Sequence, residues 1–233
     1  MGTATLPGDL TYHAFLWPGA DGKIQDLGTL GGSFANANAI NEAGEVVGFA
    51  GDNRDQVVAF LWKKGVMTNL GFLESDCVSV AQSVNSKRQI VGYSATGCGF
   101  TVRRAVLWED GSIVDLNTLI PPASGIQVTL AETINDRGEI AADGAPSGCE
   151  VVENCGHAVL LIPCDDNHPG IEGCDYSMVD ASTASVSPQP TTGIANPANQ
   201  DGPALGGAAN PMLRRFGRRF GPWYRRAQAQ PTK

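Results

Sequence analysis

The chain has 233 residues, of which 42% are hydrophobic and 17% are charged, so it is long enough to bury a core and is not disordered as a whole. Its net charge of −8 conceals an asymmetry, because residues 211–233 hold seven of the sixteen Lys and Arg and no acidic residue. The remaining body, with nine basic and twenty-four acidic residues, carries a charge of −15, which argues against nucleic-acid binding by the body because phosphate contacts need clustered Lys and Arg.

The N-terminal segment leads into repeated sequence almost at once. MGTATLPGDLTYHAFLW lacks the basic and apolar regions of a signal peptide. No apolar run in the chain reaches the roughly eighteen residues that a membrane-spanning helix needs. Two interpretations follow, a cytoplasmic protein or a sequence that lacks the start of its gene product.

A phrase that ends in tryptophan occurs three times, as HAFLW, VAFLW and RAVLW. Its tryptophans, Trp17, Trp62 and Trp108, are 45 and 46 residues apart. A second phrase keeps step, as AINEAGEVVGF at 39–49, SVNSKRQIVGY at 83–93 and TINDRGEIAAD at 133–143. A period of this length is typical of repeat architectures.

Each unit divides into four short strands. The AFLW-like strand and a strand ending in DLG, NLG or DLN are joined by a glycine-containing hairpin turn. FANANAI, VSVAQSV or VTLAETI forms the third strand, and an asparagine turn leads to the fourth, EVVGFA, QIVGYS or EIAAD. This pattern predicts an all-β, β-propeller-like repeat of three four-stranded units plus one strand, a partial propeller; a β-solenoid or β-prism is the competing interpretation.

The recurring large residues are predicted to pack between units, so Trp17, Trp62 and Trp108 are interpreted as core residues. On the third strand, strict alternation predicts that a recurring alanine points away from the apolar residue three positions later. The pairs are Ala37 and Ile40, Ala81 and Val84, and Ala131 and Ile134. A larger side chain in place of the alanine would overpack.

A polar residue directly follows each of these alanines: Asn38, Gln82 and Glu132. One interpretation is a ring of ligand-binding side chains that lines a channel or its mouth. The other is that the three residues hydrogen-bond to the ends of neighbouring strands.

The strings HAFLW, DLGTLGG, AINEAG and EVVG resemble the HAF-type repeat of bacterial extracellular proteins. The resemblance covers residues 13 to about 162. It is looser in the third unit, where Ala142 replaces the glycine found at Gly48 and Gly92, and only HAVLLIP at 157–163 represents the fourth. The family implies secretion and repeats, and it supplies no catalytic residues.

Six cysteines, four of them between 149 and 174, contain no CxxC and favour a disulfide framework, and hence an extracellular or cell-surface location. Sequence does not select among the fifteen pairings that six cysteines allow. Neighbour pairing would give Cys77–Cys98, Cys149–Cys155 and Cys164–Cys174. One competing interpretation is that the cysteines are reduced structural thiols. Another is a zinc site formed by Cys155, His157, Asp166 and His168, although its spacing is irregular.

No GxSxG elbow, HExxH, Walker loop or dinucleotide-binding fingerprint occurs. His13 and His157 hold equivalent places in their phrases, but Val58 stands there in another unit, so the position is not reserved for proton transfer. More acidic residues are present than sequence can sort into catalytic pairs, which leaves enzymatic activity open.

We therefore predict a non-catalytic extracellular or surface binding module that needs no cofactor and binds an unidentified protein or polysaccharide. It either belongs to a longer repeat protein or completes its propeller by self-association, because propellers have four to eight blades. The alternative is a propeller-type hydrolase that acts on a sugar or small polar substrate in the central channel, with Glu132, Asn38 and Gln82 as its candidate residues.

The chain is predicted to divide into a repeat domain at 10–163, a cysteine-bounded turn extension at 164–176, a disordered Ser/Pro/Ala/Gly-rich linker at 177–210 and a basic aromatic tail at 211–233. The tail interleaves cations with aromatics: Arg214, Arg215, Arg218, Arg219, Trp223, Tyr224, Arg225 and Arg226. One interpretation is salt-sensitive binding to an anionic surface, and the other is an unstructured basic end.

Overall fold

The computed structural model describes residues 1–5, 11–17, 19, 22–98, 102–121, 124–149, 155–171, 174 and 224–226. These residues form mainly β-strands and turns, and a short 3-10 turn, η1 (Leu116–Thr118), follows β11. The predicted all-β class is confirmed. No helix in the described part of the chain is long and apolar enough to cross a membrane.

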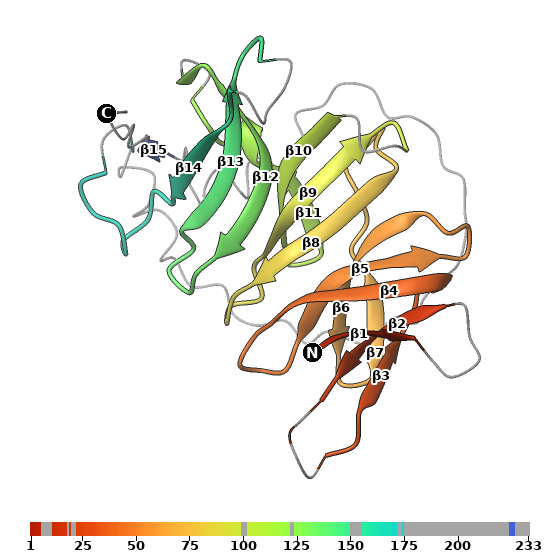
Figure 1. The fold of residues 1–233 in the computed structure, drawn as a ribbon. Coiled ribbons are helices and arrows are strands. Elements are labelled where there is room, and N and C mark those ends of the chain that lie inside the picture. The colour runs from red at the N-terminus through yellow and green to blue at the C-terminus, as the bar shows by residue number, and fades with distance from the viewer. Residues whose placement is uncertain are drawn as a thin grey trace, which may run out of the picture.

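The strands form one seven-stranded sheet and two four-stranded sheets (Figure 1). Because only one residue pair joins β2 to β4, we describe β1–β3 as an N-terminal group and β4–β7 as the first sheet. The N-terminal group holds β1 (Gly2–Thr5), β2 (Tyr12–Leu16) and β3 (Gln25–Gly28). The first sheet holds β4 (Gly31–Ile40), β5 (Val46–Asp52), β6 (Val57–Lys63) and β7 (Val66–Asn69). The second holds β8 (Val78–Val84), β9 (Ile90–Thr96), β10 (Val102–Glu109) and β11 (Ser112–Asp115). The third holds β12 (Ile126–Ile134), β13 (Ile140–Pro146), β14 (His157–Ile162) and β15 (Tyr224–Arg226).

Each sheet is antiparallel, and its strands lie in the order in which they occur in the chain. Short connections join successive strands, except that residues 163–223 separate β14 from β15. The hairpins between β6 and β7 and between β10 and β11 turn at Lys64-Gly65 and Asp110-Gly111, all four of which have positive φ. This is the two-residue turn that matches strand twist, and glycine adopts it without steric cost. In the N-terminal group, β1 and β3 both pair with β2, and a single parallel pair, Tyr12 with Phe34, connects β2 to β4.

The sheets begin two strands later than the sequence units, so the predicted unit boundaries are wrong. The AFLW-like strand β6 pairs with β5, and β10 pairs with β9, in each case the fourth strand of the preceding sequence unit. The connection from β5 to β6 is a tight turn in which Asp52 Oδ1 accepts from the backbone N–H groups of Arg54 and Gln56. The segments that follow the DLG-like strands β7 and β11 instead cross to the next sheet.

The three sheets follow one another through the molecule (Figure 1), and buried side chains of each sheet pack against those of the next. Strand β8 packs against β5 and β6, strand β12 packs against β9 and β10, and β4, β8 and β12 succeed one another along the stack. We call the face of each sheet that is turned toward the preceding strands its backward face and the opposite face its forward face. The described residues do not close into a barrel or a ring.

The core lies between successive sheets. Val47 and Ala59 on the forward face of the first sheet pack with Val84, Ile90 and Trp108 on the backward face of the second. The interface between the second and third sheets is built in the same way, from residues that include Val91, Ala105, Leu107, Ile134, Ile140, Val159 and Leu161. The N-terminal group contributes Ala14 and Leu27 to a third cluster with Phe60 and Trp62.

The prediction that all three recurring tryptophans are core residues is wrong for Trp17. Trp62 and Trp108 are 5% and 3% exposed, whereas Trp17 is 54% exposed. Ala14 and Leu16 of β2 pack toward the first sheet, so Trp17 follows the alternating side chains of the opposite, backward face. No sheet of the described chain covers that face, which explains the exposure of Trp17.

A β-bulge in the leading strand of each sheet overturns the predicted alternation of alanine and apolar residue. The register shifts between Ala37 and Ala39 in β4, between Ala81 and Ser83 in β8, and between Ala131 and Thr133 in β12. One extra residue inverts the alternation beyond it. Ala81 and Val84 consequently share one core cluster, and Ala131 and Ile134 share another.

The bulged strand presses closely on its neighbour, which explains a recurring glycine. A Cβ on Gly48 would lie 1.9 Å from the Asn36 carbonyl oxygen, and a Cβ on Gly92 would lie 2.0 Å from that of Val80. The third sheet has Ala142 at this place, opposite Ala131. Glycine is therefore required by backbone approach in the first two sheets.

The basic tail contributes a strand, although an unstructured end was one of its two interpretations. Strand β15 pairs with β14 in the third sheet, with Tyr224 opposite Ile162 and Arg226 opposite Leu160. The linker at 177–210 lies outside the described residues, as do the predicted tail-binding residues Arg214, Arg215, Arg218, Arg219 and Trp223 and the side chains of 224–226.

Candidate functional site

The three predicted ligand-binding residues, Asn38, Gln82 and Glu132, are the extra residues of the three bulges. Their strands β4, β8 and β12 are successive leading strands, with contacts from β4 to β8 and from β8 to β12. Asn38 Nδ2 donates to the Ala81 carbonyl at 2.8 Å and to Gln82 Oε1 at 3.1 Å, while Glu132 is exposed. Asn38 and Gln82 are thus joined directly, and Glu132 presents its carboxylate to solvent.

The turn between the first two strands of each sheet is held by an asparagine. Its Oδ1 accepts the backbone N–H of the residue four positions later at 2.9–3.0 Å, and its Nδ2 donates to the side-chain oxygen of that same residue at 2.6–2.8 Å. The pairs are Asn41 with Glu45, Asn85 with Gln89, and Asn135 with Glu139. Asparagine suits this place because its amide can satisfy nearby backbone and side-chain groups together.

The same asparagines connect neighbouring sheets. Asn41 Nδ2 donates to the carbonyl oxygen of Asn85 at 3.1 Å, and Asn85 Nδ2 donates to that of Asn135 at 3.0 Å. The backbone N–H of Ser86 adds a bond to Asp136 Oδ1 at 2.8 Å. Because each bond crosses from one sheet to the next, the three turns form a continuous edge, which we call the turn ladder.

Glu45 is the buried carboxylate of the first turn, with 3% of its side chain exposed. Its Oε1 lies 2.8 Å from Lys63 Nζ and 2.8 Å from Arg88 Nε, and Asn41 binds its Oε2. Burial raises the pKa of Glu45, but the hydrogen bonds from Lys63, Asn41 and Arg88 outweigh it and lower the pKa to about 2. Arg88 comes from the second sheet, so this carboxylate ties two sheets together.

The second turn uses a neutral residue at the same place. Gln89 accepts from Asn85 at 2.6 Å and donates through Nε2 to Glu109 Oε1 at 3.2 Å. Glu109 follows Trp108 as Lys63 follows Trp62. In the first sheet the acidic residue lies in the turn, and in the second it follows the tryptophan. Both arrangements place an acceptor opposite a donor, as a buried polar pair requires.

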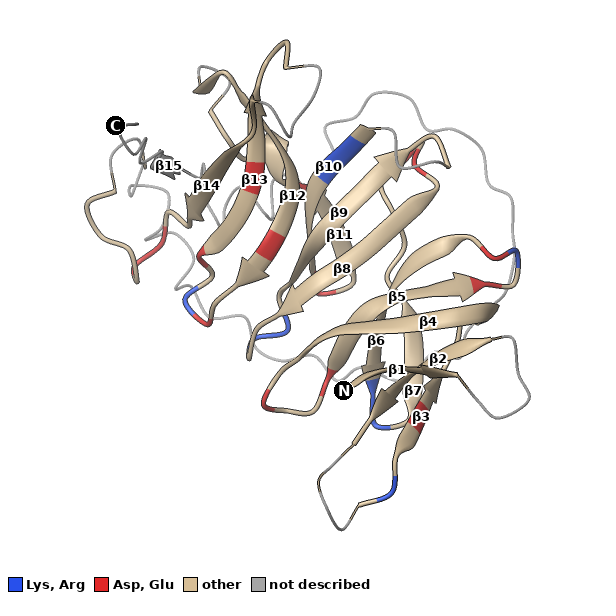
Figure 2. Ribbon diagram, in the orientation of Figure 1, with Lys and Arg blue, Asp and Glu red and all other residues tan. Residues whose placement is uncertain are grey.

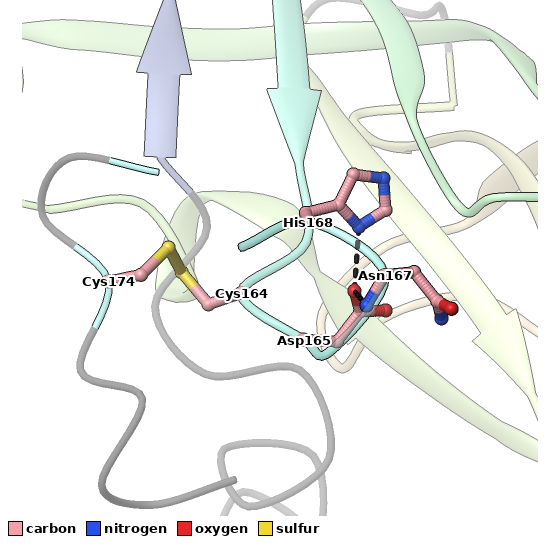
Figure 3. Close-up of a disulfide and its surroundings, with 5 residues drawn as sticks. All are labelled: Cys164, Asp165, Asn167, His168 and Cys174. Carbon is pink, nitrogen blue, oxygen red and sulfur yellow. Dashed lines mark hydrogen bonds and ion pairs between the residues drawn. A yellow bond between two sulfur atoms is a disulfide. The ribbon is translucent and has the colours of Figure 1, made fainter. Parts of the chain in front are cut away.

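A loop that contains His168, drawn in Figure 3, contacts the third turn through Glu139. His168 is 3% exposed, its Nε2 lies 3.3 Å from Glu139 Oε1, and its Nδ1 lies 2.6 Å from Asp165 Oδ1. Asn135 lowers the pKa of Glu139 by a hydrogen bond, burial opposes this, and Arg137 and His168 add to the lowering. The pKa of Glu139 therefore lies below its ordinary value.

The loop copies the geometry of the turns that it follows. The backbone N–H of His168 donates to the Asp165 carbonyl at 3.0 Å, as Gly138 donates to Asn135 at 2.9 Å. The backbone N–H of Asn167 donates to Asp165 Oδ1 at 3.0 Å. The disulfide Cys164–Cys174 brackets this loop, as Figure 3 shows. His168 thus has a structural position at the end of the turn ladder.

The cysteines are joined as the neighbour-pairing prediction has them. The structure contains Cys77–Cys98, Cys149–Cys155 and Cys164–Cys174. Cys155 therefore has no thiolate to offer to the alternative zinc set with His157, Asp166 and His168. The described residues contain no group of three or more His, Cys, Asp or Glu side chains placed to hold a metal ion.

Another ion pair is buried near the Cys77–Cys98 disulfide. Asp76, whose side chain is fully buried, accepts from Arg104 at 2.7 Å and from the hydroxyl of Ser94 at 2.5 Å. Arg104 also lies 3.7 Å from Asp115. The equivalent pair in the N-terminal group is His13 with Asp26, at 2.9 Å and more exposed. These charges fix strands to one another at the edge of the sheets.

Charged residues as a class mark the turns and strand ends more than the strand centres (Figure 2). The turn-ladder residues Glu45, Gln89 and Glu139 were not among the predicted site residues. A signal was present, because a Glu or Gln recurs four positions after each asparagine. Sequence alone does not show that this residue folds back onto the asparagine.

No protein-family model matches the chain, and neither a curated protein nor a solved structure matches it. The resemblance to HAF-type repeats therefore remains an inference from the quoted strings.

Proposed function

We propose that the chain is a non-catalytic binding module of an extracellular or cell-surface protein, built from HAF-type repeats in a β-propeller-like arrangement. The propeller-like arrangement is supported by antiparallel sheets that pack against one another, with their leading strands in succession. The extracellular location is supported by the three disulfides, which persist in oxidising compartments.

The ligand surface is proposed at the bulges of β4, β8 and β12. The observation that carries it is the repeated placement of Asn38, Gln82 and Glu132 at the bulge of three successive leading strands. Bulges re-aim side chains and are common beside functional sites. An exposed carboxylate on β12, the leading strand next to the one that carries Gln82, adds to the acceptors of the Asn–Gln pair. Such acceptors suit hydroxyl or ammonium groups, which fits a polysaccharide or a protein with basic side chains.

The recurring residues outside the bulges are engaged in holding the fold. In the turn ladder, the side chains of Asn41, Asn85 and Asn135 make their hydrogen bonds within the protein. Trp62 of the first sheet and Trp108 of the second are buried. Because recurrence is thus explained by packing and turns, it gives no support to a recurring catalytic group.

The test is a glycan and peptide array screened with the parent chain, with Glu132→Gln and with the matched control Glu42→Gln, which neutralises an exposed carboxylate in a turn. A ligand bound by the parent and by the Glu42 variant, but at least about tenfold more weakly by the Glu132 variant, supports the proposal. Turnover of a hydrolase substrate by the parent that is lost in Glu132→Gln would overturn it.

A further inference from the structure

At each end of the stack, one sheet face is exposed to solvent. The equivalent faces of the sheets inside the stack are buried against a neighbouring sheet. On the backward face, Phe60 and Trp62 of the first sheet and Trp108 of the second are buried, whereas Trp17 at the equivalent place in the N-terminal group is 54% exposed. Its neighbour on that face, Phe15, is half-buried and lies over Gly2. An aromatic surface that the chain buries at its internal interfaces is therefore open at this end.

The opposite end shows the complementary surface. Val91, Ala105 and Leu107 on the forward face of the second sheet are fully buried against the third sheet. Their counterparts in the third sheet are Ala141, Ala158 and Leu160, which are exposed, Leu160 by 39%. Small residues with one leucine thus form an open forward face at the end of the stack.

The internal interfaces show how these two faces fit. Between the first and second sheets, Trp108 of a backward face packs in one cluster with Val47 and Ala59 of a forward face, with Leu61 at its margin. The open ends repeat both halves of this contact, with Trp17 in place of Trp108 and with Ala158 and Leu160 in place of Ala59 and Leu61. A polar pair beside Trp17 also has an interior precedent, because His13 and Asp26 stand where the second sheet has Arg104 and Asp115.

We propose that two copies of this chain associate head to tail, with the Trp17 face of one copy seated on the Ala158–Leu160 face of the other. The contact continues the stacking of the sheets across the boundary between copies. It is heterologous, so it either closes into a ring or propagates. Two copies contain eight stacked strand groups, four from each, which is within the range of four to eight blades of closed propellers. The proposal concerns stacking and does not depend on the ligand surface at the bulges.

The test begins with sedimentation velocity of the full chain over a range of concentrations. We expect a concentration-dependent dimer or larger assembly, and a monomer throughout would overturn the proposal. Trp17→Glu and Leu160→Arg should each weaken association at least about 30-fold, the loss expected for a buried anchor residue. Circular dichroism spectra equal to the parent's, and unfolding midpoints equal to the parent's at a concentration at which the parent is monomeric, show that both variants are folded. Val66→Glu, at a 63% exposed residue of β7, is the matched surface control.

Mixing the two variants distinguishes the orientation. The Trp17 variant keeps an intact forward face, and the Leu160 variant keeps an intact backward face, so a head-to-tail contact predicts a one-to-one heterodimer from two monomeric variants. If the copies met through two Trp17 faces instead, the Leu160→Arg variant alone would still dimerise and the mixture would gain nothing. That result would contradict the proposed interface.

Discussion

Trp108 in the second sheet and Trp17 in the N-terminal group end the same phrase in equivalent strands, yet 3% of the first residue and 54% of the second are exposed. Strands β2 and β10 each pair with a strand on either side. The difference in exposure comes from the sheets that pack against their faces. Trp108 meets the forward face of the first sheet, whereas the sheet that would cover Trp17 is absent from the described chain. Recurrence in sequence thus reports a shared strand geometry, while burial is decided by what stacks against it.

The largest expected effect tests this difference directly. Trp108→Ala should lower the free energy of unfolding by about 3–5 kcal/mol, because it removes a large side chain from the interface between two sheets. Trp17→Ala should lower it by less than about 1 kcal/mol, because its side chain is already largely hydrated. Urea unfolding of both variants, at a concentration at which the chain is monomeric, measures the two values. Equal losses would show that Trp17 is covered in solution.

A second pair of residues compares the interior of the turn ladder with its end. Glu45 has Arg88 of the next sheet and Lys63 as partners, whereas Glu139 has His168 from a loop. The folded pKa of Glu45, about 2, is depressed below its ordinary value of 4.5, so its contribution to stability is present above pH 4.5 and is lost as the pH falls toward 2. Because the side chains of Lys63 and Arg88 are about half exposed and screened by solvent, we expect this contribution to be about 1–3 kcal/mol.

Urea unfolding of the parent and of Glu45→Gln should therefore give stabilities that converge as the pH falls from 5 to 2. Adding Lys63→Glu to that variant copies the Gln89–Glu109 pair of the second sheet and should recover part of the loss at pH 7. Glu139→Gln is the comparison at the end of the ladder and should show a smaller pH dependence. Stability curves of parent and Glu45→Gln that run parallel across this range would contradict the ion-pair account.

The local strand pattern was predictable from the sequence, and the arrangement above it was predictable only in part. Alternation and Lys64-Gly65 or Asp110-Gly111 turns are local signals, so the strands were found. The phase of the sheets depends on which connection forms a hairpin and which crosses over, and both kinds are short and polar. The bulges at Asn38, Gln82 and Glu132 have no signature in composition. The prediction from alternation therefore assigned the residues beyond each bulge to the wrong face of the sheet.

The candidate site shows the same division. The sequence identified Asn38, Gln82 and Glu132 because they recur beside alanines, and their common place at the bulges rests on backbone pairing. The turn ladder was missed because a bond such as Asn85 to Asn135 joins residues fifty positions apart. Such contacts depend on stacking, which a reading of one unit at a time does not contain.

The smallest expected effect concerns the backbone contact beside the bulge. Gly92→Ala should lower the free energy of unfolding by about 1–3 kcal/mol, because its Cβ would lie 2.0 Å from the Val80 carbonyl oxygen and the strands would have to separate. Ala142→Gly is the matched reverse change in the third sheet and should cost about 0.5–1 kcal/mol, through added freedom of the unfolded chain. Thermal and urea unfolding give both values, and hydrogen exchange at Val80 to Val84 would report the local separation. If alanine is accepted at Gly92 as readily as at Ala142, the bulged strands of the second and third sheets approach their neighbours equally, and close backbone contact is not what distinguishes the two sheets.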